Sequence, residues 1–165
     1  DFNTAYLRNL PFKDFHVAIS GQAIVGAAAT WDQNGFKQIR VRGYSRFMRC
    51  IRPLANRMLS LGGYGPLPAT DSPLNVFYAS FICIDGDDPV ILEQIIDHMR
   101  ATSPFADQSF LLLGFHENDP LRNVMQAHPA IRYASRLYLV CWPDGLNFCA
   151  AIDKKRCPYL ELGAL

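Results

Sequence analysis

The sequence predicts an α/β (α+β) fold with a central mixed sheet, an antiparallel N-terminal hairpin, a parallel central pair of strands and flanking helices. Residues 15–20 (FHVAIS) and 22–31 (QAIVGAAATW) are largely apolar and are separated by Gly21, which favours a tight antiparallel hairpin. Two further apolar runs, 74–84 (LNVFYASFICI) and 108–117 (QSFLLLGFHE), enclose a helical pattern. A strand, helix, strand unit of this length predicts a right-handed parallel crossover.

A basic helical insert is predicted between the second and third strands, at residues 36–73. The turn sequence DQNG precedes it, and the apolar residues of segment 44–59 recur at helical spacing. Pro53 lacks a backbone N–H, so a kink or a restart of the helix is expected there. No acidic residue lies between Asp32 and Asp71, and the cations of this interval form a local basic patch: Lys37, Arg40, Arg42, Arg46, Arg49, Arg52 and Arg57.

The long run at 74–84 is apolar on both faces, which predicts a strand in the middle of the sheet. The acidic sequence DGDD ends this strand. The following helix, predicted at 89–100, starts with Pro89 and ends with Arg100. Both positions match the preferences of helix ends and of the helix dipole.

The last third of the chain is expected to complete the sheet. Asp119 is placed to cap a short helix at 120–127. Residues 131–142 and 146–152 are strand-like apolar segments joined by the turn sequence PDG. This pattern predicts a closing pair of antiparallel strands.

Length and composition indicate one domain spanning residues 1–165. The chain is 50% hydrophobic and 19% charged, which is enough for one good core. No apolar run is long enough for a membrane helix, so a soluble protein without a membrane partner is expected. The cysteine pattern, which predicts reduced thiols, indicates a cytoplasmic location. The formal net charge of +1 argues against a globally basic nucleic-acid binder. Because the sequence opens at Asp1 rather than at Met, we expect it to be part of a longer protein.

The cysteines argue against a disulfide framework and against a zinc site. They are odd in number and have no C-x-x-C spacing: Cys50, Cys83, Cys141, Cys149 and Cys157. We therefore expect reduced thiols that act as small buried hydrophobic groups, and no metal.

The order of predicted elements resembles the GNAT superfamily of acyl-CoA-dependent N-acyltransferases, from the second strand of that fold to its end. The phrase GQAIVGAAATW at 21–31 is similar to the family's second hairpin strand, where small residues are common. The phrase ENDPLRNVM at 117–125 is similar to its fourth helix, which follows the fifth strand. The resemblance covers most of the chain and implies an acetyltransferase or other acyltransferase activity, with acetyl-CoA or another acyl-CoA as the donor.

The chain departs from the family pattern at three places. The family's opening strand and paired helices would precede Phe15, so the chain resembles the C-terminal part of a longer GNAT-like protein. The family's Gly-rich loop of backbone N–H donors for the pyrophosphate is replaced by Asp85-Gly-Asp-Asp88 and Pro89, which brings carboxylates and removes a donor. The family's catalytic Tyr falls near Met125, which cannot donate a proton.

The resemblance also implies that the fourth and fifth strands of the family fold splay apart and expose backbone for a cofactor. In this chain the exposed backbone falls at Phe81, Ile82, Cys83 and Ile84, and Asn118 faces it across the cleft.

Three side chains are candidates for catalysis. His116 is a candidate general base and Glu117 its orienting partner, at a strand end where α/β folds place ligands. Tyr78 shares a strand face with Ser80 and could point into the same cleft. Alternatively, Asn118 and Asp119 only cap the next helix, His116 is an edge residue whose hydrogen bonds are satisfied, and Tyr78 belongs to the core. Polar and aromatic residues from Trp31 to Gln38 also crowd one turn more than a hairpin end requires.

Two functions follow as hypotheses. One is an N-acyltransferase that transfers an acyl group to a small-molecule or peptide amine, chiefly by positioning the reactants. The other is a non-catalytic GNAT-like module that uses its basic helix to bind a partner, such as a second GNAT-like half or a second copy. Nucleic-acid binding ranks last, because aromatic residues do not interleave with the arginines on the outer helix face.

Overall fold

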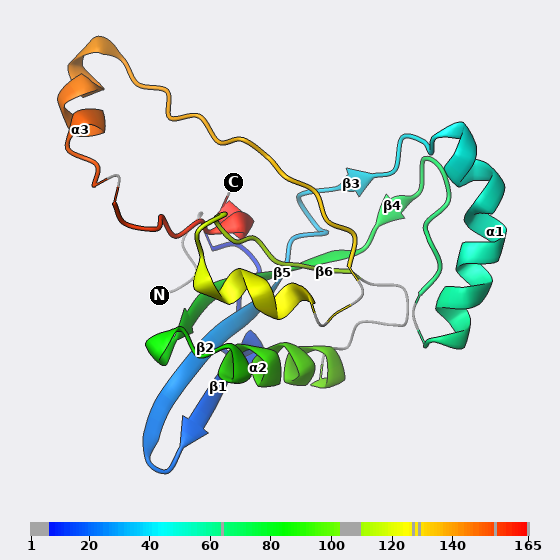
Figure 1. Ribbon diagram of the computed structural model, residues 1–165, viewed down its shortest axis with the longest axis horizontal. Helices are drawn as coiled ribbons and strands as arrows, with labels where there is room; N and C mark the ends of the chain where they lie inside the picture. The colour runs from blue at the N-terminus through cyan, green and yellow to red at the C-terminus, as the bar shows by residue number, and fades with distance from the viewer. Residues whose placement is uncertain are drawn as a thin grey trace. The chain divides into compact units, whose positions relative to one another are not determined.

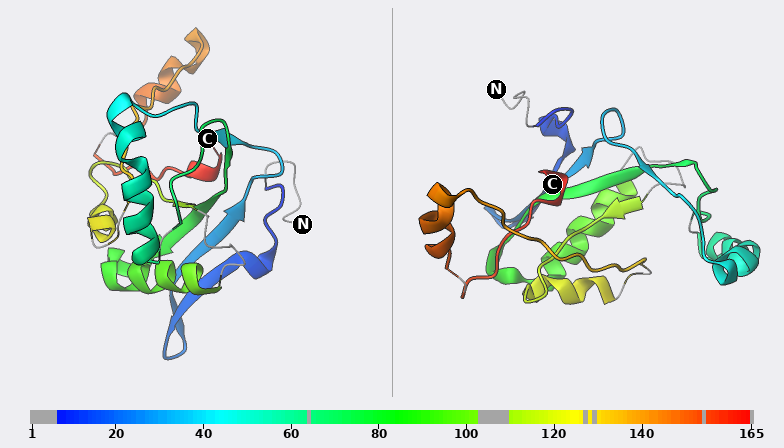
Figure 2. Two further views of the ribbon diagram at one scale, coloured as in Figure 1. Left: turned by 90° about the vertical axis from the view of Figure 1, so that its right-hand side faces the viewer. Right: turned by 90° about the horizontal axis from the view of Figure 1, so that it is seen from above.

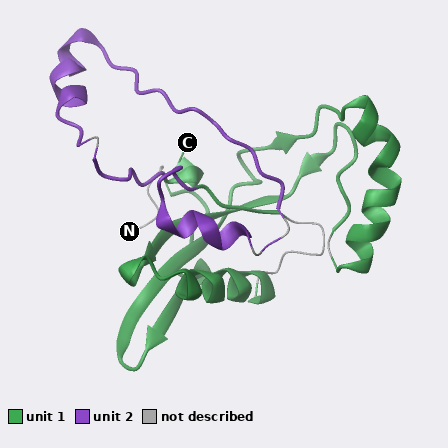
Figure 3. Ribbon diagram, in the orientation of Figure 1, with its two compact units in different colours: residues 1–114, 161–165 green, residues 115–160 purple. Residues whose placement is uncertain are grey.

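The chain forms two compact units, which are described separately here (Figure 3). The first contains residues 1–114 and 161–165, and the second contains residues 115–160. The computed structural model describes residues 7–63, 65–102, 110–126, 128, 130–153 and 155–164.

The first unit is built on a four-stranded sheet with the order β1-β2-β5-β6 (Figure 1). Strands β1 (Phe15–Ser20) and β2 (Ala23–Asp32) form an antiparallel hairpin, and Gly21 in its turn has a φ of 62°. Strand β5 (Val76–Ile84) pairs antiparallel with β2 and parallel with β6 (Phe110–Leu112). The predicted mixed sheet, with its hairpin and its parallel pair, is confirmed.

One face of this sheet is covered by helix α2 (Pro89–Thr102), which contacts β1 and β2. Its buried side chains are Leu92, Ile95, Ile96 and Met99. Gly26 of β2 lies directly under the helix, because a Cβ at this position would come within 2.7 Å of the Ile91 Cγ2 atom. The small residues of β2 therefore let the helix approach the sheet closely.

The opposite face carries the main hydrophobic cluster. Its buried members are Leu10, Ala29, Trp31, Val76 and Tyr78, and Leu7, Phe15, Leu74, Phe81, Phe110, Leu112 and Leu162 pack against them. The cluster thus combines the central strands with residues from both ends of the chain. Trp31 of β2 and Phe81 of β5 belong to this cluster and also line the candidate site described below.

The interval between β2 and β5 contains a two-stranded sheet and helix α1 (Arg46–Leu61). The small sheet pairs β3 (Ile39–Arg40) with β4 (Pro73–Leu74), and α1 lies beyond it, away from the four-stranded sheet (Figures 1 and 2). Ser45 caps α1 by accepting a hydrogen bond from the Met48 N–H.

The expected restart of the helix at Pro53 is wrong, because α1 runs through this residue. Pro53 and Arg49, whose carbonyl loses its usual donor, are both exposed. Water can therefore satisfy the carbonyl without a break in the helix.

The second unit begins with the short helical segment that was expected. A 3-10 helix spans Pro120–Gln126, and the Asp119 carboxylate accepts a hydrogen bond of 2.9 Å from the Leu121 N–H. Ala127, the last residue of the predicted helix, lies outside the described residues.

The predicted closing strands at 131–142 and 146–152 are wrong. Residues 131–142 have no regular secondary structure, and a 3-10 turn at Pro143–Gly145 continues into the short helix α3 (Leu146–Ala150). A strand needs a ladder partner, and the described part of this unit contains none. The apolar alternation therefore leads to exposed side chains such as Val140 and Trp142.

Two further expectations need correction. Of the run at 108–117, only Phe110–Leu112 forms a strand, and residues 108 and 109 lie outside the described residues. None of the five cysteines forms a disulfide, but they are not buried: Cys149 is half-buried and the other four are exposed. Cys83 faces outward near the end of β5, and three of the others lie in the largely exposed segment 130–160.

A histidine pair, His16 and His98, joins β1 to α2. The rings of His16 and His98 meet edge to face, with centroids 5.3 Å apart, and His16 Nε2 lies 2.9 Å from Thr30 Oγ1. Burial lowers the pKa of His16 below 6.5, the charge of His98 lowers it further, and Asp14 opposes the shift. The neutral ring is therefore favoured in the folded state.

We predict that the melting temperature falls as the pH is lowered below 6.5. The unfolded chain binds the His16 proton more tightly, so this stabilisation is present above pH 6.5 and is lost as the pH falls through the lowered folded-state pKa. His98→Gln removes the neighbouring charge and should make the fall shallower, measured by thermal denaturation between pH 5 and 8. Gln94→Ala, on an exposed position of the same helix, is the control and should leave the slope unchanged. A slope unaffected by His98→Gln would contradict the assignment.

Candidate functional site

Strand β5 loses its parallel partner halfway along its length. Pairing with β6 runs from Val76 opposite Phe110 to Tyr78 opposite Leu112, whereas β5 itself continues to Ile84. On its other side β5 remains paired with β2 as far as Ile84. The outer edge of β5 beyond Tyr78 is thus the part of the sheet where another group can bind the backbone.

A bulge at Phe81 turns the backbone of this edge. Residues 81 and 82 lie opposite Ala28 alone, between the pairs Ser80–Ala29 and Cys83–Ala27. Phe81 has a φ of 55°, in the left-handed region that glycine usually occupies at such a bulge. Its ring stacks on Phe15 and on Trp31, with centroids 6.1 and 6.2 Å away, and this packing holds the unusual backbone in place.

The Phe81 N–H donates a hydrogen bond of 2.6 Å to Glu161 Oε2. The other carboxylate oxygen, Oε1, accepts from the Gly163 N–H at 3.1 Å. Segment 161–164, which contains a 3-10 turn at Leu162–Ala164, therefore lies at the edge of β5. A carboxylate is held next to a strand backbone donor.

Gly163 fits closely against the sheet. A Cβ on this residue would lie 2.6 Å from Trp31 Cε3 and 2.8 Å from Ser80 Oγ, so a side chain has no room there. Ser80 is 1% exposed, and its hydroxyl has no hydrogen-bond partner among the described residues. The close fit fixes where Glu161 stands.

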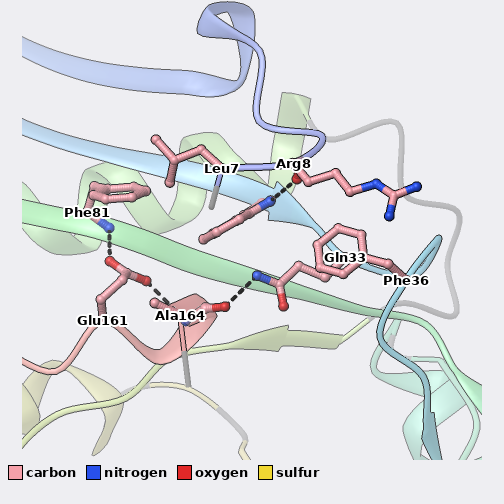
Figure 4. A pocket seen from close by; sticks show the side chains of 9 residues that line it. Leu7, Arg8, Gln33, Phe36, Phe81, Glu161 and Ala164 are labelled. Carbon is pink, nitrogen blue, oxygen red and sulfur yellow. Dashed lines mark hydrogen bonds between the residues drawn. The ribbon is translucent and has the colours of Figure 1, made fainter. Parts of the chain in front are cut away.

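A cavity of about 480 Å³ opens beside this contact (Figure 4). Its walls come from the start of the described chain, the end of β2 and the turn after it, β5, and segment 161–164: Leu7, Arg8, Trp31, Gln33, Phe36, Phe81, Glu161, Gly163 and Ala164. Phe81 and Glu161 stand at one end, and Gln33 and Phe36 at the other (Figure 4). The size is within the range of small-molecule sites, about 300–1,000 Å³.

The turn after β2 is fixed to β5, which positions Gln33. Asn34 Nδ2 donates to the Val76 carbonyl at 3.2 Å, and the Val76 N–H donates to Asn34 Oδ1 at 3.3 Å. Asp32 Oδ1 accepts from the backbone N–H and the side-chain amide of Asn34. The crowded turn noted in the sequence is therefore one end of the cavity.

Tyr78, a candidate for catalysis, is part of the core. It is 3% exposed, and the Lys37 ammonium lies 5.0 Å from its ring centroid. Burial raises the pKa of its hydroxyl. These surroundings match the structural role considered for Tyr78 in the sequence.

The four predicted cofactor-binding positions on β5 differ in their surroundings. Phe81 carries the bulge and lines the cavity, and Ile82 is half-buried. Cys83 is exposed and paired with Ala27, whereas Ile84 is buried at 8% exposure. Among these four, Phe81 is the one that joins the cavity.

His116, Glu117 and Asn118 belong to the second unit, so the cluster is described by itself. The Asn118 N–H donates to His116 Nδ1 at 3.2 Å, and the Asp119 N–H donates to the His116 carbonyl at 3.0 Å. Arg122 Nη1 donates to the Glu117 carbonyl at 3.0 Å. These contacts are those of a turn that leads into the next helical segment.

The acidic loop before α2 uses its own groups at the helix N-terminus. Asp88 Oδ1 accepts a hydrogen bond of 2.8 Å from the Val90 N–H, and Pro89 has no N–H. Asp85, Asp87 and Asp88 are all exposed. The Val90 N–H, a helix N-terminal donor that a bound phosphate would need, is therefore already bound to a carboxylate.

Sequence reasoning missed Glu161 as a site residue. Its partner Phe81 lies 80 positions earlier in the chain, and no spacing motif connects the two. The signal available in the sequence was a carboxylate followed by Gly163 within an otherwise apolar ending, LELGAL.

In comparisons with known proteins, no family model, no curated protein and no solved structure matches this chain. Within the described residues, His, Cys, Asp and Glu side chains form no group of three or more that could hold a metal ion. None of the described helices combines the length and the apolar composition needed to cross a membrane.

Proposed function

We propose that the protein is a divergent GNAT-type N-acyltransferase that transfers an acyl group from a thioester to an amine at the outer edge of β5. The observation that carries the proposal is the Phe81 N–H, which a bulge turns toward a cavity and a carboxylate at the point where β5 has left β6. A backbone donor of this kind can bind a thioester carbonyl and stabilise the negative charge that develops on its oxygen.

Acyl transfer needs a proton acceptor close to the amine, and the Glu161 carboxylate can act as this acceptor. The amine nitrogen attacks the thioester carbonyl carbon, an amide bond forms, and the carbon–sulfur bond breaks to release a thiolate. The Glu161 carboxylate accepts the proton that the nitrogen loses and passes it to the thiolate, which leaves as a thiol. In this account the donor carbonyl replaces Glu161 at the Phe81 N–H, and the carboxylate stays beside it. Positioning in the cavity supplies much of the rate enhancement.

The donor is recognised through its acyl group and pantetheine arm rather than through a pyrophosphate. The loop before α2 presents Asp85, Asp87 and Asp88, and its helix donor is already bound to Asp88. Each close pair of like charges costs on the order of 1 kcal/mol even in water. Acetyl-CoA would therefore bind through the part of the molecule that it shares with acetyl-pantetheine.

We predict amine-dependent thiol release with comparable kcat/KM for acetyl-pantetheine and acetyl-CoA, measured with a thiol reagent and a panel of amines. Glu161→Gln should lower kcat by about 10² to 10⁴, the usual contribution of a general base. Glu117→Gln, the same substitution at the carboxylate singled out in the sequence, is the matched control and should keep full activity. The proposal fails if neither donor releases thiol in the presence of any amine, or if Glu117→Gln is as damaging as Glu161→Gln.

A second candidate function is a non-catalytic module that associates with a second copy through α1, and the exposed face of this helix favours it. Phe47, Leu54, Met58 and Leu61 are between 64% and 85% exposed, and no residue of α1 is buried. Arg46, Arg49 and Arg57 are also exposed, and the opposite side of the helix is held by the following loop through Arg52 and Asn56. The acidic loop at residues 85–88 has the complementary charge, so that one copy can bind another head to tail.

For this second candidate we predict association that increases with protein concentration and weakens with salt, measured by analytical ultracentrifugation. Arg57→Glu should reduce the association, because it reverses an exposed charge next to Leu54 and Leu61 on the contact face. Lys13→Glu, the same charge change at another exposed position, should not. A monomer at all concentrations and at low salt would exclude this candidate.

A further inference from the structure

The strongest unassigned feature of the cavity is the side chain of Gln33. It is 1% exposed, and its Nε2 group donates a hydrogen bond of 2.6 Å to the Gly163 carbonyl. Its carbonyl oxygen, Oε1, has no hydrogen-bond partner among the described residues. Because a buried acceptor without a partner is costly, Oε1 is a position where a ligand N–H would be favourable.

The walls beside Gln33 are aromatic. The rings of Trp31 and Phe81 are stacked with an interplanar angle of 27°, and Phe36 lines the same cavity. Trp31 Nε1 donates to the Arg8 carbonyl at 2.8 Å, so the indole is fixed and its N–H is already used. Such walls suit a flat apolar group, and the negative faces of the rings attract a cation.

The charges in the cavity also favour a cation beside Gly163. The Glu161 carboxylate and the Gln33 amide bind opposite ends of the same residue, since Glu161 accepts from the Gly163 N–H and Gln33 donates to the Gly163 carbonyl. Arg8 also lines the cavity and is positively charged, but it is exposed. Its guanidinium lies 5.6 Å from the Phe36 ring centroid. Anionic and acceptor groups thus flank Gly163, and the guanidinium lies over Phe36.

We propose that this cavity binds a primary ammonium attached to an aromatic group, with an N–H of the ligand donating to Gln33 Oε1. The aromatic group packs between Trp31, Phe36 and Phe81, and the positive charge is balanced by Glu161. The inference deepens the proposed function, on which it rests for the statement that the neutral amine, formed when this ammonium loses a proton to solvent, is the acyl acceptor. Binding itself needs only the cavity, so it can be tested without acyl transfer.

The test uses phenethylamine as the ligand and 2-phenylethanol as a neutral control with the same aromatic group. The chain has two tryptophans, so a Trp142→Phe background leaves Trp31 as the fluorescent reporter in the cavity wall. Phenethylamine should change the Trp31 emission in a saturable way, with a Kd at least tenfold lower than that of the alcohol. Isothermal titration calorimetry on the unmodified chain should give the same order of affinity.

Gln33→Met keeps the size of the side chain and removes the acceptor, so it should weaken phenethylamine binding at least tenfold. Gln38→Met is the matched control at an exposed position and should bind as the unmodified chain does. A lack of saturable binding, equal affinity for amine and alcohol, or unchanged binding by a folded Gln33→Met variant would each overturn the inference. The comparison of amine with alcohol uses no substitution at Gln33, so it decides the question even if that variant does not fold.

The inference and the proposed function fail in different ways. Phenethylamine binding without any thiol release would support the cavity assignment and refute the acyltransferase. Thiol release with other amines, together with no binding of phenethylamine, would do the reverse.

Discussion

The backbone N–H of Phe81 has to be satisfied without the help of a strand, and the candidate site follows from the way this is done. Pairing with β6 stops at Tyr78, and the bulge turns the Phe81 amide out of the ladder with β2. A backbone donor without a partner is unfavourable, so the position needs an acceptor. Glu161 Oε2 supplies it at 2.6 Å. That single contact brings a carboxylate from a distant part of the sequence to the outer edge of β5.

The surrounding residues fit this contact. Gly163 packs against Trp31 and Ser80 without room for a Cβ, and its carbonyl accepts the hydrogen bond from Gln33. The turn that carries Gln33 is bound to β5 through Asn34. Aromatic rings, a carboxylate and a buried amide oxygen therefore surround one cavity, although they come from segments far apart in the chain. The loop before α2, where the GNAT family binds a pyrophosphate, instead carries the exposed carboxylates of Asp85, Asp87 and Asp88.

Much of the sheet could be predicted from the sequence because its signals are local. The glycine at position 21 and the two apolar runs around it indicate a hairpin, and the run at 74–84 indicates a central strand; both predictions are confirmed. The segments at 131–142 and 146–152 carry the same kind of pattern, but the described residues of their unit include no partner strand. Apolar alternation shows that a strand is possible, but the ladder that stabilises it depends on tertiary structure.

The candidate site was only partly predictable for the same reason. The crowded turn from Trp31 to Gln38 was visible as a local feature of the sequence, whereas the exposed backbone at Phe81 was implied by the resemblance to the GNAT fold. Glu161 was not predicted, because it meets Phe81 across 80 residues, and Gln33 meets Gly163 across 130. His116 and Glu117 attracted attention as a dense polar cluster, and the contacts made by their backbone and by His116 Nδ1 are those of a turn. Where the N-acyltransferase pocket is proposed, long-range contacts decide which residues meet.

The most direct measurement of this account is amide hydrogen exchange at Phe81, followed by NMR. If Glu161 holds this N–H, exchange should be slow in the unmodified chain and at least tenfold faster in Glu161→Ala. The Ile84 amide, whose residue is paired with Gly26 in the ladder, should exchange at the same rate in both proteins. Equal exchange of the Phe81 amide in the two proteins would contradict the account, because the carboxylate would then not be its partner.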